Sequence, residues 1–173
     1  MSAYRPDPIV MLSARQLSEA IHKKEVSSRE VMTAYLAHIA RVNPGSNAIV
    51  AMQDEEALMR EASAADEALA AGKSSGWMHG FPQAPKDLAM TRGIRTTYGS
   101  PIFRDNIPAS DSVIVERMRR AGSILIGQTN TPEFGLGSHT FNPVYGATLN
   151  PYDPTRSAGG SSGGAAAALA LRM

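Results

Sequence analysis

The residues best suited to chemistry are Ser161 and Ser162, which lie between two pairs of glycines in the segment 159–164. Glycine permits positive φ angles and a close approach of other groups. An alanine-rich stretch, residues 165–170, follows directly, and alanine is the strongest helix former. The pattern predicts a tight turn that delivers two hydroxyls to a helix N-terminus, where free N–H groups and the helix dipole favour developing negative charge.

Three other structures are compatible with this glycine- and serine-rich segment. A flexible linker is one, although a linker does not normally merge into a strongly helical apolar stretch. A phosphate-binding P-loop is the second, but the required Gly-Lys-Ser/Thr ending is missing. The third is an ordinary buried turn. The rest of the chain must therefore decide whether the two serines form a reactive site.

Lys86 is the second candidate, because it is the single lysine among apolar and proline residues in the segment 77–88. A lysine in such a setting can simply extend its ammonium group to solvent. Alternatively, partial burial lowers the pKa of the amine, so that it is neutral near pH 7 and acts as a base. The segment therefore predicts either a solvated lysine or a general base.

The composition is that of a folded globular chain and excludes several kinds of site. The 173 residues are 43% hydrophobic and 19% charged, with a formal net charge of +1, a balance that gives no support for nucleic-acid binding. The absence of cysteine excludes disulfides, thiolate zinc sites and a cysteine nucleophile. The four histidines show no metal-ligand spacing, and the sequence shows neither a signal peptide nor an apolar run long enough to span a bilayer. We therefore expect a cytoplasmic protein without membrane contact.

Helix-start signals recur in the first 72 residues. Two of them are capping boxes, in which a serine and a Gln or Glu satisfy each other's backbone N–H groups; they lie at Ser13–Gln16 and Ser27–Glu30. These signals predict helices over 12–21 and 27–42, which together form a helical hairpin and a packing layer. Asp54 caps a third predicted helix, which ends near residue 71.

Short apolar strands are predicted beside these helices. One covers residues 47–52, and another covers 123–127 directly after a helix over 112–120. Asp111 or Ser110 is the expected cap of that helix. The alternation of helix and buried strand is typical of an α/β fold whose sheet is covered on its faces.

Two further segments lie outside this alternation. Residues 128–135 leave the end of a strand, where sites in α/β proteins tend to lie. Residues 140–156 contain three prolines and little periodicity, which predicts an irregular segment leading to the Gly/Ser turn.

Taken together and in order, several motifs of the chain resemble the amidase signature family. They are His79-Gly80 through Lys86-Asp87-Leu88, Tyr98-Gly99-Ser100, Gly127-Gln128-Thr129-Asn130 with Glu133-Phe134-Gly135, Asn150-Pro151, and the Gly159–Gly164 segment before the alanine-rich helix. The resemblance covers essentially the whole chain, and the ordered combination is far more specific than any one motif.

The resemblance implies an α/β fold that is the N-terminal part of the amidase signature fold, a mixed β-sheet core covered by helices and incomplete in this chain. All 173 residues would form the N-terminal portion of a single amidase domain. Residues 1–72 would be mainly a helical layer. Residues 73–173 would be the sheet-forming part, with Lys86 and the Gly/Ser motif.

The chemistry implied by the resemblance is hydrolysis of a carboxylic amide to an acid plus ammonia or an amine by a Ser-cisSer-Lys relay. By position, Lys86 matches the base, and Ser161 matches the middle serine, which follows a cis peptide bond. Neutral Lys86 would take a proton from Ser161, which would take one from a nucleophilic serine. The supporting residues would be Ser162, Gly159, Gly160 and Gly163. The resemblance implies a small-molecule amide substrate and neither a metal nor a cofactor.

The chain departs from the family at the nucleophile. In the family this serine lies beyond the alanine-rich helix and a strand, in an Asp-x-Gly-Gly-Ser segment that also supplies the oxyanion hole. No such segment occurs in the 173 residues. We therefore expect a truncated form that lacks the nucleophile and is inactive alone. It should also be poorly stable or aggregation-prone, because a parallel strand without its neighbours exposes apolar faces and unpaired edges.

Two other functions compete with this interpretation. One is a non-catalytic binding or interaction protein derived from the N-terminal half of an amidase, which would dock through its helices. The other is a phosphate-binding module, which lacks the P-loop lysine. The amide itself stays open, from small aliphatic and aryl amides to carbamates, peptide amides and the substrate of a glutamine amidotransferase subunit. The oligomeric state is also open.

Overall fold

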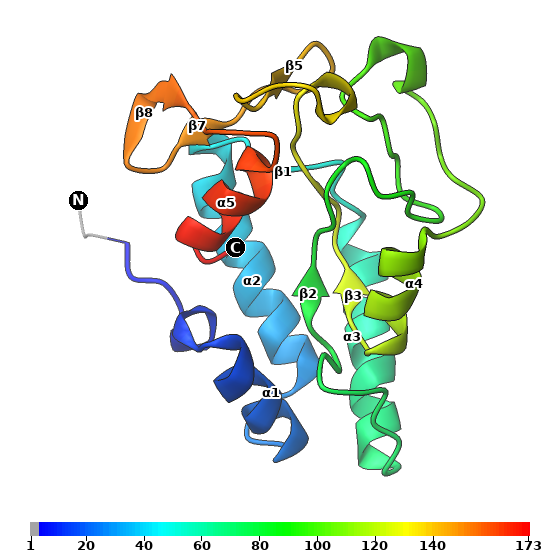
Figure 1. The fold of residues 1–173 in the computed structure, drawn as a ribbon. Helices are drawn as coiled ribbons and strands as arrows, with labels where there is room; N and C mark the ends of the chain where they lie inside the picture. Colours follow the sequence, from blue (N-terminus) through cyan, green and yellow to red (C-terminus); the bar gives the residue numbers. More distant parts are fainter. Residues whose placement is uncertain (1–3) are drawn as a thin grey trace.

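A computed structural model describes residues 4–173 of the chain (Figure 1). Its helices are α1 (Ala14–His22), α2 (Ser28–Val42), α3 (Glu55–Ala70), α4 (Val113–Arg120) and α5 (Gly163–Ala170). Its strands are β1 (Ile49–Val50), β2 (Pro82–Gln83), β3 (Ile124–Leu125), β4 (Gln128–Thr129), β5 (Phe141–Asn142), β6 (Gly146–Ala147), β7 (Leu149–Asn150) and β8 (Asp153–Ser157). Short 3-10 turns, η1 to η4, cover Pro8–Met11, Asn43–Gly45, Pro101–Phe103 and Glu133–Gly135.

The segment 124–129 is the centre of the strand arrangement. Its first part, β3, pairs in parallel with β2, and its last part, β4, pairs antiparallel with β1. The parallel pairing continues beyond β2 as a single bridge between Lys86 and Thr129. Parallel and antiparallel pairs therefore meet on one segment, which confirms the expected mixed arrangement of strands.

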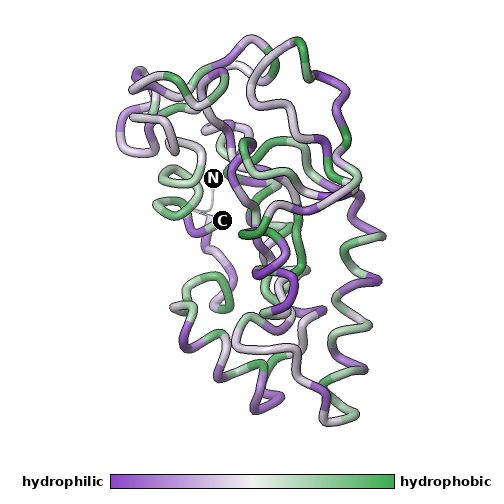
Figure 2. The backbone as a smooth tube through the Cα atoms, turned by 45° about the vertical axis from the view of Figure 1, so that its right-hand side comes forward, coloured by the Kyte–Doolittle hydropathy of each residue, from purple (hydrophilic) through white to green (hydrophobic). Residues whose placement is uncertain are grey.

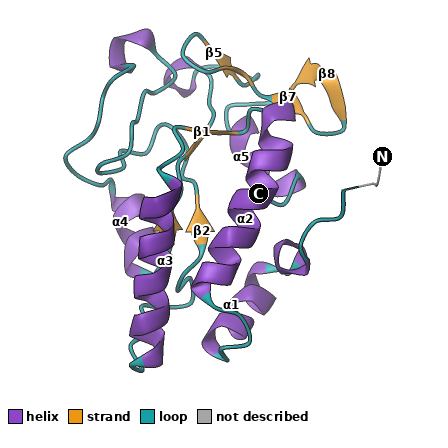
Figure 3. Ribbon diagram, turned by 180° about the vertical axis from the view of Figure 1, so that it is seen from behind, coloured by secondary structure: helices purple, strands orange, loops and turns teal. Residues whose placement is uncertain are grey.

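Helices cover this segment on both faces, because successive side chains of a strand point to opposite sides. Ile124 and Ile126 pack with Met32 of α2 and Leu58 of α3 in the main hydrophobic cluster. Leu125, between them, packs instead with Ile94 and Val115 of α4. In Figure 3, seen from behind, β2 is visible between α2 and α3, the two helices that pack on the face of Ile124 and Ile126. The α/β class predicted from the sequence is therefore confirmed.

The helices differ in how much of their surface is apolar. Figure 2 shows purple and green alternating along α3, as expected for a helix with one buried face, whereas α5 carries only pale and green colours. A helix that is apolar all round is typical of a fully covered position. In this structure, however, Leu169 of α5 is 77% exposed.

The first three helices begin as the sequence predicts. The Ser13–Gln16 and Ser27–Glu30 capping boxes both form, and Asp54 accepts a hydrogen bond from the backbone N–H of Ala57. The structure adds a cap that the sequence does not announce. Asp66 of α3 accepts hydrogen bonds from the N–H groups of Ser28 (2.6 Å) and Arg29 (3.1 Å) at the start of α2.

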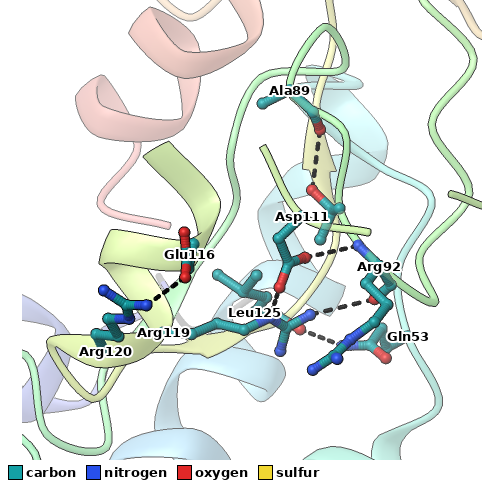
Figure 4. A network of polar contacts seen from close by, with 9 residues as sticks. Gln53, Ala89, Arg92, Asp111, Glu116, Arg119, Arg120 and Leu125 are labelled. Carbon is teal, nitrogen blue, oxygen red and sulfur yellow. Dashed lines mark hydrogen bonds and ion pairs between the residues drawn. The ribbon is translucent and has the colours of Figure 1, made fainter. Parts of the chain in front are cut away.

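The start of α4 corrects the prediction. The N-cap residue is Ser112, and neither Asp111 nor Ser110 occupies that position. Asp111 accepts instead from the backbone N–H of Arg92 at 2.7 Å and pairs with Arg119 at 3.1 Å (Figure 4). Its carboxylate thus closes the loop that precedes α4, and those contacts leave it unavailable as a cap.

Residues 140–156 also differ from the prediction of an irregular segment. They form two short antiparallel hairpins, β5–β6 and β7–β8. Asn142 organises the first turn, because its side-chain oxygen accepts from the N–H groups of Val144 (2.9 Å) and Tyr145 (2.8 Å). Three of the four strands have only two residues, and the five-residue β8 contains a proline, so no alternating pattern is visible and the sequence appears irregular there.

The sequence contains no apolar run long enough to span a bilayer, and the length and hydropathy of the helices test this prediction. Among residues 4–173, no helix combines the length and the hydropathy needed to cross a membrane.

Candidate active site

Lys86 lies just beyond β2, at the carboxyl end of the parallel pair. Its backbone is fixed from the neighbouring segment: the N–H of Thr129 donates to the carbonyl of Pro85 (2.7 Å), and the N–H of Asp87 donates to the carbonyl of Thr129 (3.0 Å). In the amide orientation that satisfies its neighbours, the Gln128 side chain donates to the carbonyls of Pro85 (3.1 Å) and Lys86 (3.0 Å). The backbone that carries the amine is therefore held on both sides.

The structure brings Lys86 together with both candidate serines. Its Nζ atom lies 2.7 Å from Oγ of Ser161 and 3.0 Å from Oγ of Ser162, residues separated from it by 75 and 76 positions. Ser161 is partly buried and Ser162 is exposed. Partial burial lowers the pKa of the Lys86 amine below the ordinary lysine value. The two hydroxyl contacts and the lowered pKa favour the interpretation of Lys86 as a partly desolvated amine over that of a freely solvated lysine.

The Gly/Ser segment is the tight turn that its composition predicts. The Gly160–Ser161 peptide bond is cis, and α5 begins at Gly163, directly after Ser162. The hydroxyl of Ser162 forms no cap hydrogen bond with the helix, so it is free to contact the lysine. The predicted delivery of two hydroxyls to a helix N-terminus is therefore confirmed.

Four hydrogen bonds to residues outside the turn fix its path. The N–H of Gly160 donates to the carbonyl of Ser138 (2.6 Å), the N–H of Gly163 to the hydroxyl of Thr140 (2.9 Å), and the N–H of Gly164 to the carbonyl of Asn130 (3.2 Å). The hydroxyl of Thr131 donates to the carbonyl of Ser161 (3.3 Å). The turn is thus built into the hairpin and strand region.

The four glycines of the turn are not equivalent. A Cβ atom on Gly164 would lie 2.3 Å from the backbone nitrogen of Asn130, and one on Gly163 would lie 2.3 Å from the Thr140 hydroxyl. At Gly160 the nearest atom would be 3.0 Å away, whereas at Gly159 nothing lies within 4 Å. Close backbone approach therefore requires glycine at 163 and 164, and space does not require it at 159.

The sequence places residues 128–135 near a site but predicts no role for the side chains that support this turn. Thr131, Thr140 and Asn130 are fully buried, and the Asn130 amide contacts Thr148 (3.0 Å) and Asn142 (2.7 Å). The available signal was the run Thr129–Asn130–Thr131 directly after an apolar strand, where polar side chains are placed at the sheet edge.

The chemistry of this arrangement follows from its donors and acceptors. A neutral lysine amine within hydrogen-bond reach of a serine hydroxyl can accept its proton and raise the nucleophilic character of that oxygen or of a third group. Among residues 4–173, no three His, Asp or Glu side chains gather in a group able to hold a metal ion. The site described here is therefore one of amine and hydroxyl groups.

Comparison with known proteins agrees with these features. The protein-family description "Amidase" matches residues 30–173. A glutamyl-tRNA(Gln) amidotransferase subunit of Azoarcus sp. (strain BH72) is 42% identical over 165 residues, which are 95% of this chain and 34% of that protein. The corresponding protein of Acidothermus cellulolyticus is 43% identical over 162 residues, 94% of this chain and 32% of that protein.

Solved structures show the same similarity in three dimensions. A bacterial aryl acylamidase of the amidase signature enzymes superposes with a TM-score of 0.87 at 33% identity, over 95% of this chain and 34% of that one. Fatty acid amide hydrolase superposes with a TM-score of 0.89 at 26% identity, over 95% and 29%. The chain spans about a third of the length of the relatives that it matches. It therefore belongs to the amidase signature family and has the fold of the N-terminal portion of those enzymes.

Proposed function

We propose that this chain supplies the base and the relay serine of an amidase that hydrolyses carboxylic amides on linear C–N bonds. The observation that carries the proposal is the 2.7 Å contact between Nζ of Lys86 and Oγ of Ser161. The lowered pKa of the amine supports it, because a base must be neutral near the working pH. The family to which the chain belongs hydrolyses C–N bonds, which supports the same reaction class.

In the proposed relay, neutral Lys86 accepts the proton of Ser161 as Ser161 accepts the proton of a nucleophilic serine. The oxygen of that serine bonds to the amide carbon, and the carbon–nitrogen bond breaks as the departing nitrogen takes a proton back from the relay. The released product is ammonia or an amine. Water then cleaves the acyl ester and restores the serine.

The nucleophile in this proposal lies outside the 173 residues. Ser161 is already the relay, and Ser162 is its sequence neighbour, so neither is available to attack. We propose that Ser162, whose hydroxyl lies 3.0 Å from Nζ, supports the amine by a hydrogen bond. Gly159, Gly160 and Gly163 would shape the turn around these two hydroxyls.

The test compares two proteins. The first is the 173-residue chain, and the second is a chimera in which this chain replaces the matching third of the bacterial aryl acylamidase. Release of amine or ammonia from an anilide and from simple amides is followed between about pH 6 and 9, the range in which a base with a tuned pKa acts. We expect an active chimera and an inactive 173-residue chain.

Variants then test the roles. In the chimera, Lys86→Ala and Ser161→Ala should each lower kcat about 10²- to 10⁴-fold, the usual contribution of general-base catalysis. Lys73→Ala, which removes an exposed lysine, is the matched control and should leave kcat unchanged. An active chimera that tolerates Lys86→Ala or Ser161→Ala would overturn the proposal. Activity in the 173-residue chain would overturn the assignment of the nucleophile alone.

The alternative is a non-catalytic binding protein. It predicts a monodisperse 173-residue chain and a folded chimera that hydrolyses none of the amides. That combination of results would favour the alternative over the amidase.

A further inference from the structure

A fully buried carboxylate follows Lys86 directly in the chain. Asp87 has no exposed surface, and both of its oxygens accept hydrogen bonds from one short turn. Oδ1 accepts from the N–H of Thr97 (2.7 Å), and Oδ2 accepts from the Thr97 hydroxyl (2.6 Å) and from the N–H of Gly99 (3.2 Å). A single side chain thus joins the end of the β2 segment to residues 97–99.

This carboxylate has no ion-pair partner within residues 4–173. Burial raises the pKa of the Asp87 carboxyl, while the hydrogen bonds from Thr97 and Gly99 act in the opposite direction. A buried charge without a counter-ion is costly unless donors surround it. The three donors of the turn therefore stabilise the Asp87 carboxylate, and the positive charge of Arg95 adds a smaller favourable contribution without forming an ion pair with it.

The turn that Asp87 holds reaches further across the site. Tyr98, between the two donor residues, has a positive φ of 54°, and its carbonyl accepts from the N–H of Phe134 (2.7 Å). The segment around Phe134 follows Thr131, whose hydroxyl donates to the carbonyl of Ser161. Asp87 is thus connected to Ser161 through the turn at residues 97–99, the segment from Phe134 back to Thr131, and the hydrogen bonds between these parts.

We infer that Asp87 is a positioning residue: its clamp on residues 97–99 fixes the backbone of Lys86 and so holds the amine against Ser161. The inference rests on the proposed role of Lys86 as the base. A lysine side chain is long and flexible, so the position of Nζ depends on where its backbone is held. When the clamp opens, the amine gains access to water and leaves the hydroxyl.

Two simpler roles give different results, which makes the inference testable. If Asp87 acted only as a neighbouring negative charge, its neutralisation would lower the pKa of Lys86, because an anion favours the ammonium form. If Asp87 only filled space, an isosteric change would leave that pKa unchanged. Positioning predicts the third result, a rise towards the ordinary lysine value as the amine becomes hydrated.

The measurement is the titration of lysine side chains by NMR in the 173-residue chain labelled with ¹³C at the lysine ε-carbon. The chain has four lysines, Lys23, Lys24, Lys73 and Lys86, so the spectrum is simple, and the Lys86 signal is assigned by Lys86→Arg. In the unaltered chain the Lys86 pKa should lie below the ordinary lysine value. If it does not, the proposed function fails, independently of Asp87.

The decisive variant is Asp87→Asn, which keeps the shape but cannot accept all three hydrogen bonds. It should raise the Lys86 pKa to the ordinary lysine value, and Thr97→Val, which removes one donor, should raise it part of the way. Asp105→Asn makes the same chemical change at an exposed position and should have no effect. An unchanged or lowered Lys86 pKa in Asp87→Asn would overturn the inference.

A second measurement decides the matter if Asp87→Asn unfolds the short chain. In the chimera, displacement of the amine by about 1 Å should lower kcat about 10²-fold. KM should stay within about twofold, because the lost contact acts on the chemical step. The lower limb of the pH–rate profile should move to higher pH along with the Lys86 pKa. A kcat within about twofold of the unaltered chimera, or an unshifted profile, would overturn the positioning role.

Discussion

Gly164→Ala should displace the start of α5 and, with it, the turn that carries Ser161 and Ser162. Glycine at this position lets α5 approach the backbone of residues 48 and 130 closely. A Cβ atom would lie 2.3 Å from the nitrogen and 2.5 Å from the oxygen of Asn130, and 2.8 Å from the carbonyl oxygen of Ala48. All three atoms belong to backbone, so no side chain can rotate away. The start of α5 must therefore move.

The size of the effect follows from these distances. An ordinary contact begins at 3.4 Å, so the helix must withdraw by about 1 Å, and the hydrogen bond from Gly164 to Asn130 breaks. Overpacking of this kind costs about 1–3 kcal/mol, and the lost bond costs about 1 kcal/mol. The higher helix propensity of alanine returns about 0.5–1 kcal/mol. We expect the free energy of unfolding to fall by about 1–3.5 kcal/mol.

Urea unfolding of the 173-residue chain at low micromolar concentration measures this change, and the chimera measures the rate. Because Ser161 and Ser162 precede Gly164 closely in the same turn, kcat should also fall about 10²-fold. Gly159→Ala is the matched control, since nothing lies within 4 Å of its Cβ position, and it should change the stability by less than about 0.5 kcal/mol. Equal stability of the two variants would refute the reasoning from close approach.

Three further results are expected from urea titration and light scattering. Burial lowers the pKa of Lys86 in the folded chain, so between that pKa and the pKa of the unfolded chain the unfolded state binds more protons. The free energy of unfolding of the unaltered chain should therefore rise from about pH 7 to 10 relative to that of Lys86→Met. A difference that stays constant with pH would contradict this. Asp66→Ala removes the acceptor at the start of α2 and should cost about 1–2 kcal/mol, whereas Glu67→Ala, an exposed neighbour, should cost almost nothing. Because Leu169 is 77% exposed on an apolar helix, the 173-residue chain should bind a hydrophobic dye and associate as its concentration rises. Leu169→Gln should reduce both the dye binding and the association. A chain that stays monomeric at all concentrations would contradict the prediction that the exposed helix causes association.

The sequence predicts the helices better than the strands because a helix start has a recognisable local motif. A capping box needs only Ser27 and Glu30, and both are visible three positions apart. The partners in the two hairpins are also close in sequence, three to eight positions apart, but three of the four strands have only two residues and show no periodic pattern. The Asn-Pro steps at 142–143 and 150–151 indicate turns without indicating which residues pair. The predicted cap of α4 was wrong because Asp111 accepts from the backbone N–H of Arg92 and pairs with Arg119, contacts that form only in the folded chain.

The residues of the candidate site could be predicted from the sequence, whereas the residues that hold them in place could not. Lys86 and the Gly/Ser turn each stand out as residues, and the family resemblance joined them before the structure placed them at 2.7 Å. Nothing local indicates that Thr140 supports Gly163, or that Asp87 clamps Thr97, because threonine and aspartate occur at many turns. Such supporting roles depend on distant backbone groups that only the folded chain brings together.

Lys86 and Ser161 are far apart in the sequence, and this separation determines the order in which parts of the chain can fold during synthesis. Nζ of Lys86 meets a hydroxyl 75 positions later, and His38 of α2 contacts the carbonyl of Leu171, 133 positions away. The helical hairpin needs only neighbouring residues, so it can form on the ribosome while the rest is still being synthesised. Lys86 can contact the Ser161 hydroxyl only after residue 161 has been synthesised. A translation product arrested before residue 161 would emerge with its helical layer in place and its amine without a hydroxyl partner.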